Sequence, residues 1–436
     1  MSFDLTTLGE IALGSNGAVD GPFGSNLKAS SYTESGIPVI RGSNLSLGLD
    51  EFKSDEFVYV GDDTYSRLAR SECLPQDIIF TKKGTLGQTG FVPQEPYHSY
   101  LISSNQMRLR VDPAKANPKY VYYWVSSKKA IDKIRGESEH TGVPKINLDY
   151  LKKFPISLPS VSYQNSAVEI LNNLNDKIAL NTQTNQTLEQ MAQAIFKSWF
   201  VDFDPVKAKV NGEQPEGMDA ATASLFPEKL DSETGIPAGW SQGVISDIAK
   251  LNAKSWTKKN QPEQVHYVDL ANTKNGVIET VTTYDFDEAP SRARRVLNSG
   301  DTIVGTVRPG NRSFAFIGKT EQPLTGSTGF AVLSPKEEFW TSFVYLATTN
   351  DDSIDEYARL ADGGAYPAIK PVVVADTPCV IPTTDIAQKF WQLTGAMLKK
   401  AHQNRLENEE LAKLRDTLLP KLLSGEIELG TEVGES

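Results

Sequence analysis

The chain has 436 residues, 39% of them hydrophobic, enough for two or three domains with sizeable cores. It has no apolar run of about 18 residues, no signal-like N-terminus and only two cysteines, Cys73 and Cys379, so we expect a soluble protein of the reducing cytoplasm rather than a membrane or disulfide-rich one. The net charge of −11 argues against nucleic acid, but residues 201–238 contribute −5 and residues 426–436 contribute −4, which leaves room for local basic surfaces.

Residues 1–160 have the pattern of a turn-rich α+β domain. Short β-type runs occur in "GIPVIRGSNL", "DEFVYV", "QDIIFTKKG" and "QMRLRV", and Gly, Asn, Asp and Pro bound them. Residues 117–138 have the period of one amphipathic helix. We therefore predict a globule with a mostly antiparallel or irregular sheet.

Residues 161–200 have the pattern of a coiled-coil helix. Apolar and Asn residues alternate at steps of four and three, which is a heptad seam: Ala167, Leu171, Leu174, Ile178, Asn181, Asn185, Leu188, Ala192 and Ile195. One helix of this length would span about 60 Å. Residues 201–238 are acidic and rich in Pro and Gly, so they are predicted to be a linker.

The rest of the chain repeats the same order of elements. Residues 239–383 are predicted to form a second globule with one helix at 337–361, residues 384–425 a second long helix, and residues 426–436 an acidic tail. Adding 223 to the first seam gives a weaker second one: Phe390, Thr394, Met397, Ala401, Asn404, Asn408, Leu411, Arg415 and Leu418.

Matching residues recur at a nearly constant offset, which indicates a duplicated unit. Pro144, Ile146, Leu151, Pro155 and Pro159 lie 223 residues before Pro367, Ile369, Val374, Pro378 and Pro382. Asp77 matches Asp301 at an offset of 224. The predicted fold class is thus α+β, with two similar α/β recognition globules, two long helices in an antiparallel intramolecular coiled coil, and a pseudo-two-fold repeat.

The asparagines of the two seams are expected to meet inside this coiled coil. Buried Asn pairs fix the register of coiled coils at some cost in stability. The alternative is that the seam opens there and leaves the asparagines exposed to solvent.

Motifs of common catalytic sites are absent from the sequence. GxxxxGK[ST], GxSxG, HExxH and CxxC do not occur, and there are only four histidines. We therefore expect no catalytic residue, no metal site and no cofactor in this chain, and a binding role instead.

Polar and basic loop residues are the candidates for binding DNA. Arg and Lys can contact guanine or phosphate, and Asn and Gln can pair with adenine. The candidates are Arg41, Asn44, Lys82, Lys83, Asn105, Gln106, His140 and Lys145 in the first globule, and Arg292, Arg294, Arg308, Asn311, Arg312, Tyr366 and Lys370 in the second. Ordinary solvated turns are the alternative for any one of these residues.

Five stretches together resemble the DNA-specificity subunit of type I restriction-modification systems. They are "GIPVIRGSNL", "DIIFTKKGTLGQTGFV", "HTGVPKINLDYLKKFPISLP", "NQTLEQMAQAIFKSWFVDFDPV" and "LAKLRDTLLPKLLSGEI", and the likeness covers essentially the whole chain. It implies a non-catalytic subunit whose two target-recognition domains read a bipartite site on double-stranded DNA. It also implies two methyltransferase partners, which would bind S-adenosylmethionine, and motor-nuclease subunits that can join them. The second globule has "VRPGNRS" in place of "KKGTLG", so contact residues do not transfer there.

Two other hypotheses stay open at this point. The chain could be a two-headed scaffold for another protein or a glycan, with no role on DNA. It could also be an enzyme with an unrecognised site, for example a carboxylate-based hydrolase.

Overall fold

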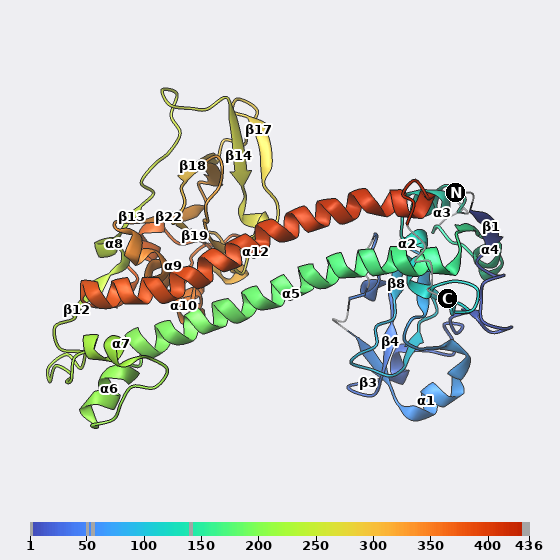
Figure 1. Cartoon of the computed structure of the whole chain (residues 1–436), viewed down its shortest axis with the longest axis horizontal. Coiled ribbons are helices and arrows are strands. Elements are labelled where there is room, and N and C mark those ends of the chain that lie inside the picture. The colour runs from blue at the N-terminus through green and yellow to red at the C-terminus, as the bar shows by residue number, and fades with distance from the viewer. Residues whose placement is uncertain (1–2, 49–51, 54–56, 139–142, 430–436) are drawn as a thin grey trace, which may run out of the picture. The chain divides into compact units, whose positions relative to one another are not determined.

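The computed structural model describes residues 3–48, 52–53, 57–138 and 143–429 and divides into two compact units (Figure 1). Unit 1 comprises residues 1–178 and 409–436, and unit 2 comprises residues 179–408. We call residues 3–158 the first globule and residues 241–381 the second globule. Within the described residues, no helix is both long and apolar enough to cross a membrane.

The first globule is built on three sheets. A two-stranded sheet pairs β1 with β11, a four-stranded sheet has the order β2-β10-β7-β8, and a five-stranded sheet has the order β3-β5-β4-β9-β6. All pairings are antiparallel except β4 with β9. The strands are β1 (Asp4–Thr7), β2 (Ala18–Asp20), β3 (Tyr32–Thr33), β4 (Ile37–Ile40), β5 (Val58–Val60), β6 (Glu72–Cys73), β7 (Ile78–Thr81), β8 (Thr89–Phe91), β9 (Tyr100–Ile102), β10 (Gln106–Leu109) and β11 (Pro155–Leu158).

The second globule repeats these three sheets, except that its counterpart of the five-stranded sheet has four strands and contains no equivalent of β3. β12 pairs with β23, one four-stranded sheet has the order β13-β22-β19-β20, and another has the order β17-β14-β21-β18, with β14 and β21 parallel as β4 and β9 are. A small hairpin of β15 and β16 is added. The strands are β12 (Ser241–Val244), β13 (Ala249–Leu251), β14 (Gln264–Val268), β15 (Thr273–Lys274), β16 (Val277–Ile278), β17 (Thr282–Asp285), β18 (Ala293–Leu297), β19 (Thr302–Gly305), β20 (Phe314–Phe316), β21 (Leu324–Ser327), β22 (Phe330–Pro335) and β23 (Pro378–Ile381).

Each globule has two consecutive helices where we predicted one. In the first globule α2 (Pro118–Val125) ends before α3 (Lys128–Gly136), and in the second α9 (Thr341–Thr349) ends before α10 (Asp351–Leu360). The prediction of single helices at 117–138 and 337–361 was therefore wrong. The cause is a new N-cap in each: the Ser127 hydroxyl accepts from the Ala130 amide at 3.3 Å, and the Asn350 side chain accepts from the Ser353 amide at 2.9 Å.

Among the remaining short helices, α4 (Leu148–Lys153) of the first globule corresponds to α11 (Pro371–Ala375) of the second. The other two are not equivalent, because α1 (Asp62–Arg67) lies between β5 and β6 and α8 (Ile245–Ile248) lies between β12 and β13. Because α4 and α11 start 223 residues apart, the repeat extends to the strand that leads into each long helix.

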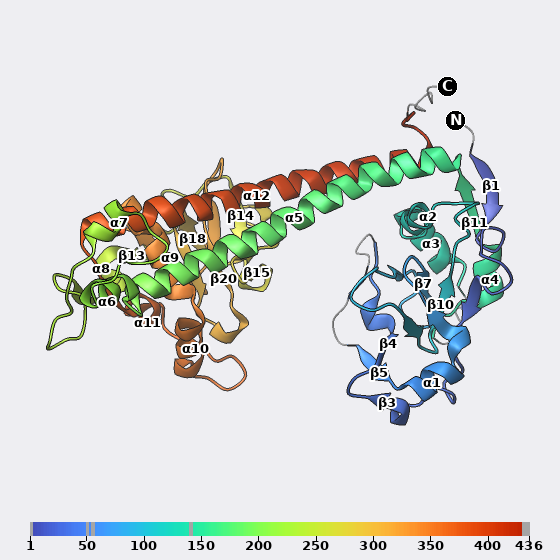
Figure 2. The same cartoon turned by 60° about the horizontal axis from the view of Figure 1, so that its bottom comes forward.

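The two long helices are α5 (Val161–Phe200) and α12 (Thr384–Ser424), and they pair antiparallel within each unit (Figures 1 and 2). In unit 1 the Tyr163 hydroxyl of α5 donates to the Leu422 carbonyl of α12 at 3.1 Å. In unit 2 Asn181 and Asn185 of α5 face Asn408 and Asn404 of α12. The predicted fold class of two α/β globules and an antiparallel intramolecular coiled coil is confirmed.

The predicted seam residues lie in the helix pair with their side chains buried or half-buried. This holds for Leu171, Leu174, Ile178, Asn181, Asn185, Leu188, Met397, Ala401, Asn404, Asn408 and Leu411. Asn404 donates to the Asn185 side chain and Asn181 donates to Asn408, each at 2.9 Å. The asparagines therefore meet inside the pair, and the alternative of an open seam does not describe this structure.

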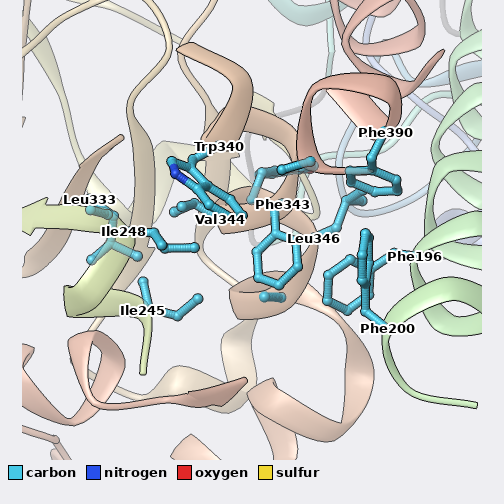
Figure 3. Packing of buried hydrophobic residues seen from close by; sticks show 14 of the residues in the cluster. Phe196, Phe200, Ile245, Ile248, Leu333, Trp340, Phe343, Val344, Leu346 and Phe390 are labelled. Carbon is cyan, nitrogen blue, oxygen red and sulfur yellow. The ribbon is translucent and has the colours of Figure 1, made fainter. Parts of the chain in front are cut away.

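Aromatic side chains join the long helices of unit 2 to its globule (Figure 3). Phe200 of α5 lies 4.8 Å from Phe390 of α12 and 4.9 Å from Phe343 of α9, measured between ring centroids. Each such ring buries a large apolar area, so the helix ends belong to the core of the second globule.

The stretch between α5 and the second globule is more ordered than a linker. It contains α6 (Asp204–Val210) and α7 (Ala220–Leu225), which the sequence pattern did not predict. Phe226 is buried with its ring 4.9 Å from Trp199 of α5. One buried aromatic and two short helices thus fix this segment to unit 2, although its composition is that of a linker.

Candidate nucleic-acid interface

The loop between β7 and β8 docks on a proline-containing segment in the first globule. We call residues 82–88 the basic loop and residues 143–147 the proline corner. Lys83 and Lys145 form an antiparallel bridge, the Ile146 amide donates to the Lys82 carbonyl at 3.0 Å, and the Gly84 amide donates to the Pro144 carbonyl at 3.2 Å. These backbone bonds hold the loop in one shape.

The second globule contains the same docking between its own basic loop, residues 306–313, and its proline corner, residues 365–370. Val307 and Ala368 form the bridge, the Ile369 amide donates to the Thr306 carbonyl at 2.9 Å, and the Arg308 amide donates to the Pro367 carbonyl at 2.7 Å. The three contacts correspond one to one with those of the first globule. The repeat therefore conserves the frame of the loop while its side chains differ.

Both basic loops adopt a left-handed backbone at two matching positions. In the first globule these are Gly84, at φ +108°, and Gly87, at φ +86°. In the second globule they are Arg308, at φ +48°, and Arg312, at φ +59°. Glycine adopts this conformation freely, whereas a residue with a Cβ is strained by roughly 1–3 kcal/mol.

A polar cavity of about 410 Å³ lies beside the basic loop of the first globule. It brings together four of the candidates predicted from the sequence, namely Arg41, Lys83, Asn105 and Gln106. The other lining residues are Leu27, Tyr32, Gly42, Thr81, Thr85, Gln88, Ser103 and Ser104. The cavity thus collects guanidinium, ammonium, amide and hydroxyl groups, which are the groups that recognise base edges and phosphates.

The candidates around this cavity differ in how they present their side chains. Arg41 is half-buried, and its backbone amide donates to the Asn44 side chain at 2.9 Å. Asn44 is fully buried and donates to the Lys53 carbonyl at 3.1 Å, so its amide holds the turn that follows β4. Gln106 is also buried and accepts from the Ser103 hydroxyl, while Asn105 is exposed.

The candidate lysines of the first globule lie on the basic loop and on the proline corner. Lys82 pairs with Asp20 at 3.1 Å, with both side chains about one-third exposed. Lys83 of the loop and Lys145 of the corner are exposed. His140 lies outside the described residues. The positive charge of this region therefore resides mainly on the loop and the proline corner.

Two arginines of the second globule are paired with carboxylates. Arg292 donates to Asp269 at 2.6 Å and to the Tyr267 hydroxyl at 2.8 Å, and these bonds raise the pKa of Arg292, with the Tyr267 bond the larger cause. Arg312 pairs with Asp351 at 2.7 Å. Each of these guanidinium charges is partly balanced within the globule.

The other candidates of the second globule lie on the loop, the corner and β18. Arg294 donates to the Ala293 carbonyl at 2.8 Å and stacks 4.9 Å from the Phe286 ring centroid. Arg308 stacks 4.6 Å from the Tyr366 ring centroid. Asn311 and Lys370 are exposed, and Tyr366 is 71% exposed. The structure thus brings Arg308 and Asn311 of the basic loop together with Tyr366 of the proline corner, whereas Arg292 lies just before β18 and Arg294 lies on it.

Some residues that line the cavity of the first globule were missed by the sequence reasoning. Gln88 donates to the Leu45 carbonyl at 3.3 Å and accepts from Thr81 at 3.3 Å, and Thr85 lies on the same loop. Both belong to "KKGTLGQ", of which only the lysines were predicted to bind DNA. Their position in the sequence could have indicated this role, because polar residues of one loop between two strands lie on the same surface as its lysines.

The groups gathered here suit binding rather than bond-breaking. They are cations, amides and hydroxyls on two loop frames, and the described residues contain no cluster of three or more His, Cys, Asp or Glu side chains that could hold a metal ion. Such groups recognise a polar, anionic surface by hydrogen bonds and charge.

Comparisons with known proteins agree with this architecture. Residues 32–190 match the family model described as the type I restriction modification DNA specificity domain. The chain is 26% identical over 378 residues to the type I restriction enzyme HindI specificity subunit of Haemophilus influenzae, covering 76% of this chain and 82% of the relative. It is 24% identical over 439 residues to the MjaIX specificity subunit of Methanocaldococcus jannaschii, covering 96% and 91%.

A solved structure shares the fold over nearly the whole chain. It is the S subunit of a type I restriction-modification system from M. genitalium, with a TM-score of 0.58, 14% sequence identity, and coverage of 99% of this chain and 97% of the other. The predicted resemblance is confirmed by these findings, and so is the expectation of a non-catalytic specificity subunit. The chain is thus similar over most of its length to type I restriction-modification specificity subunits, and residues 32–190 match the model of their DNA specificity domain.

Proposed function

We propose that this chain selects a bipartite DNA site for a type I restriction-modification complex, with each globule reading one half-site through its basic loop and proline corner. The observation that carries the proposal is the shared loop frame. The backbone contacts of residues 82–84 with 144–146 recur at residues 306–308 with 367–369, while the side chains on the frames differ. Two domains that recognise different DNA sequences can share one loop backbone, but they need different side chains to contact the bases.

Methyltransferase subunits are the proposed partners that supply the chemistry. The candidate interface contains binding groups only, and its relatives are named as subunits of restriction enzymes. We propose two methyltransferase subunits, with S-adenosylmethionine bound by them and no cofactor held by this chain, and motor-nuclease subunits that can join. The acidic net charge of −11 agrees with partners that provide part of the DNA-binding surface.

Co-expression with a type I methyltransferase subunit from the same host, followed by methylome sequencing, tests this proposal. We expect methylation at one bipartite motif, which disappears when this chain is omitted. Exchanging the second globule, residues 241–381, for that of a relative should change one half of the motif and leave the other half intact. Methylation that is unchanged without this chain would contradict the proposal, and recovery of a protein or glycan ligand with no methyltransferase would favour a two-headed scaffold.

A further inference from the structure

The Arg308 side chain occupies a backbone position where the first globule has glycine. Gly84 and Arg308 make the equivalent amide bond to Pro144 and Pro367, and both have positive φ. A Cβ built on Gly84 would meet no atom within 4 Å, so this position faces open space on that frame. Glycine would satisfy the loop, yet the second globule keeps a strained arginine there.

The contacts of Arg308 orient its guanidinium without neutralising it. The Nη2 atom donates to the Ala365 carbonyl at 2.7 Å, and the guanidinium carbon lies 4.6 Å from the Tyr366 ring centroid. Within the described part of the chain, no carboxylate pairs with this group, whereas Arg292 and Arg312 pair with Asp269 and Asp351. The Arg308 guanidinium is therefore exposed to solvent, fixed by these two contacts, and without a carboxylate partner in the described residues.

We propose that Arg308 is a guanine-reading residue of the second globule and that the Tyr366 ring positions its guanidinium. This inference rests on the proposed function, because it assumes that the second globule reads DNA. A guanidinium fork can donate two hydrogen bonds to guanine O6 and N7 in the major groove, and a side chain fixed by stacking loses less freedom on binding. The backbone strain at Arg308 is explained if the arginine side chain makes a contact with DNA that glycine at this position could not make.

The matched first globule supports the division of roles. The residue equivalent to Tyr366 is Val143, at an offset of 223, and the residue equivalent to Arg308 is Gly84, so both members of the stack are absent there together. The first globule has its charge at Lys82, Lys83 and Lys145 instead. Arg308 and Tyr366 thus form one functional pair that belongs to the second half-site alone.

The test uses the full chain assembled with its methyltransferase partner and a randomised double-stranded DNA library. We compare wild type with Arg308→Gly, Tyr366→Phe and Tyr366→Ala, and use Lys413→Gln, on the exposed face of α12, as a control that removes the same charge. In wild type one position of the second half-site should require guanine. Arg308→Gly should weaken that preference roughly 10- to 100-fold and leave the first half-site unchanged.

The tyrosine variants separate positioning from direct contact. Tyr366→Phe keeps the ring and should keep the guanine preference, whereas Tyr366→Ala should weaken it without replacing guanine by another base. In wild type, 7-deazaguanine at the selected position removes the N7 acceptor and should reduce binding to about the level of Arg308→Gly. Lys413→Gln should leave every base preference unchanged.

The melting temperature of Arg308→Gly distinguishes a base-reading arginine from one that only stabilises the loop. Because Arg308→Gly relieves a left-handed backbone, its melting temperature should equal or exceed that of wild type. A clear drop in melting temperature, with the guanine preference intact, would show that the stack only supports the loop.

An equal loss of affinity for all DNA sequences in Arg308→Gly would show that the guanidinium contacts a phosphate, and would overturn base reading. If the wild-type complex selects no sequence at all, the proposed function itself fails; if it selects a bipartite site that Arg308→Gly does not alter, only this inference fails.

Discussion

Asp77 and Asp301 occupy the same place in the two globules but have different partners. Each carboxylate accepts a backbone amide three residues earlier, from Leu74 at 2.8 Å and from Asn298 at 2.7 Å. Asp77 also accepts two bonds from Arg110, both at 2.8 Å. Ser334 stands at the position equivalent to Arg110, and burial raises the pKa of Asp301. The same turn is therefore supported by an ion pair in one copy and by hydrogen bonds alone in the other.

Replacing Asp77 by asparagine should destabilise unit 1. The substitution keeps an acceptor for Leu74 but leaves Arg110 and the buried Arg108 without their carboxylate, at a cost of roughly 3 kcal/mol. Thermal unfolding followed by circular dichroism, with limited proteolysis to locate the unfolded unit, measures the effect. A melting temperature equal to that of wild type would show that the ion pair contributes nothing to stability.

The matched substitution Asp301→Asn should have the opposite sign. A raised pKa in the folded state means that the charged carboxylate destabilises the fold at neutral pH, and that this loss is recovered as the pH falls through the folded pKa. The variant should therefore be more stable than wild type at pH 7. Calorimetry at pH 7 and pH 4.5 should show the difference shrinking at the lower pH, and a difference that grows there would contradict the assignment.

At the scale of elements, the long helices carry polar pairs inside an apolar seam. Asn404 is 1% exposed, and in the described structure its side-chain nitrogen donates to Asn185 while its oxygen has no partner. Leucines at both positions would pack better, so the asparagines reduce stability in exchange for a fixed register of α5 against α12.

Breaking one asparagine pair should cost more than replacing both members. Asn185→Leu leaves the Asn404 amide buried without its acceptor and should destabilise unit 2 by about 1–3 kcal/mol. The double variant Asn185→Leu with Asn404→Leu should regain at least the wild-type melting temperature. Differential scanning calorimetry of the three proteins checks this order, and a single variant as stable as wild type would show that the pair is not coupled.

The sequence predicted the elements best where a pattern is long. The heptad steps from Ala167 to Ile195 defined α5, and the constant offset of the prolines defined the repeat. The breaks between α2 and α3 and between α9 and α10 were missed, because one capping side chain, Ser127 or Asn350, decides each break and the apolar period continues across it. Short-range capping competes with periodicity at a single residue, so a pattern averaged over many residues does not show it.

The sequence predicted which types of residue line the candidate interface, but not which of these side chains are exposed to solvent. Lys83, Asn105 and Arg41 line one cavity, as residues of neighbouring loops in a DNA reader should. Asn44 could not be recognised as a buried turn residue, because its role depends on Lys53, nine residues away, and on the strand before it. The stack of Arg308 on Tyr366 joins segments 58 residues apart, and only the docking of loop on corner brings them together.

At the scale of the whole molecule, two copies of one domain are joined through two long helices. If the helix pair sets the number of base pairs between the half-sites, its length should be read out in the DNA. Duplicating residues 182–188 in α5 and the facing residues 401–407 in α12 adds one heptad to each helix while it keeps the Asn181–Asn408 and Asn185–Asn404 pairs in register. The added length is about 10 Å, equivalent to about three base pairs.

Methylome sequencing of a host with this double duplication checks the expectation. Both half-sites should stay as they are, and the spacer between them should lengthen by about three base pairs. An altered half-site with an unchanged spacer would refute the role of the helix pair, and duplication in α5 alone serves as the control that breaks the pairing.

The left-handed positions of the basic loops have a consequence for how new specificities can arise. Since the frame accepts glycine at 84 and arginine at 308 with the same backbone contacts, loop shape and loop chemistry vary independently. If the basic loops read DNA as proposed, a point mutation at such a position changes the recognised base without refolding the domain. The duplicated gene segment also allows recombination to move a loop from one half-site to the other. On the proposed function, a restriction system that contains this chain acquires a new target in small steps, each of which leaves a folded subunit.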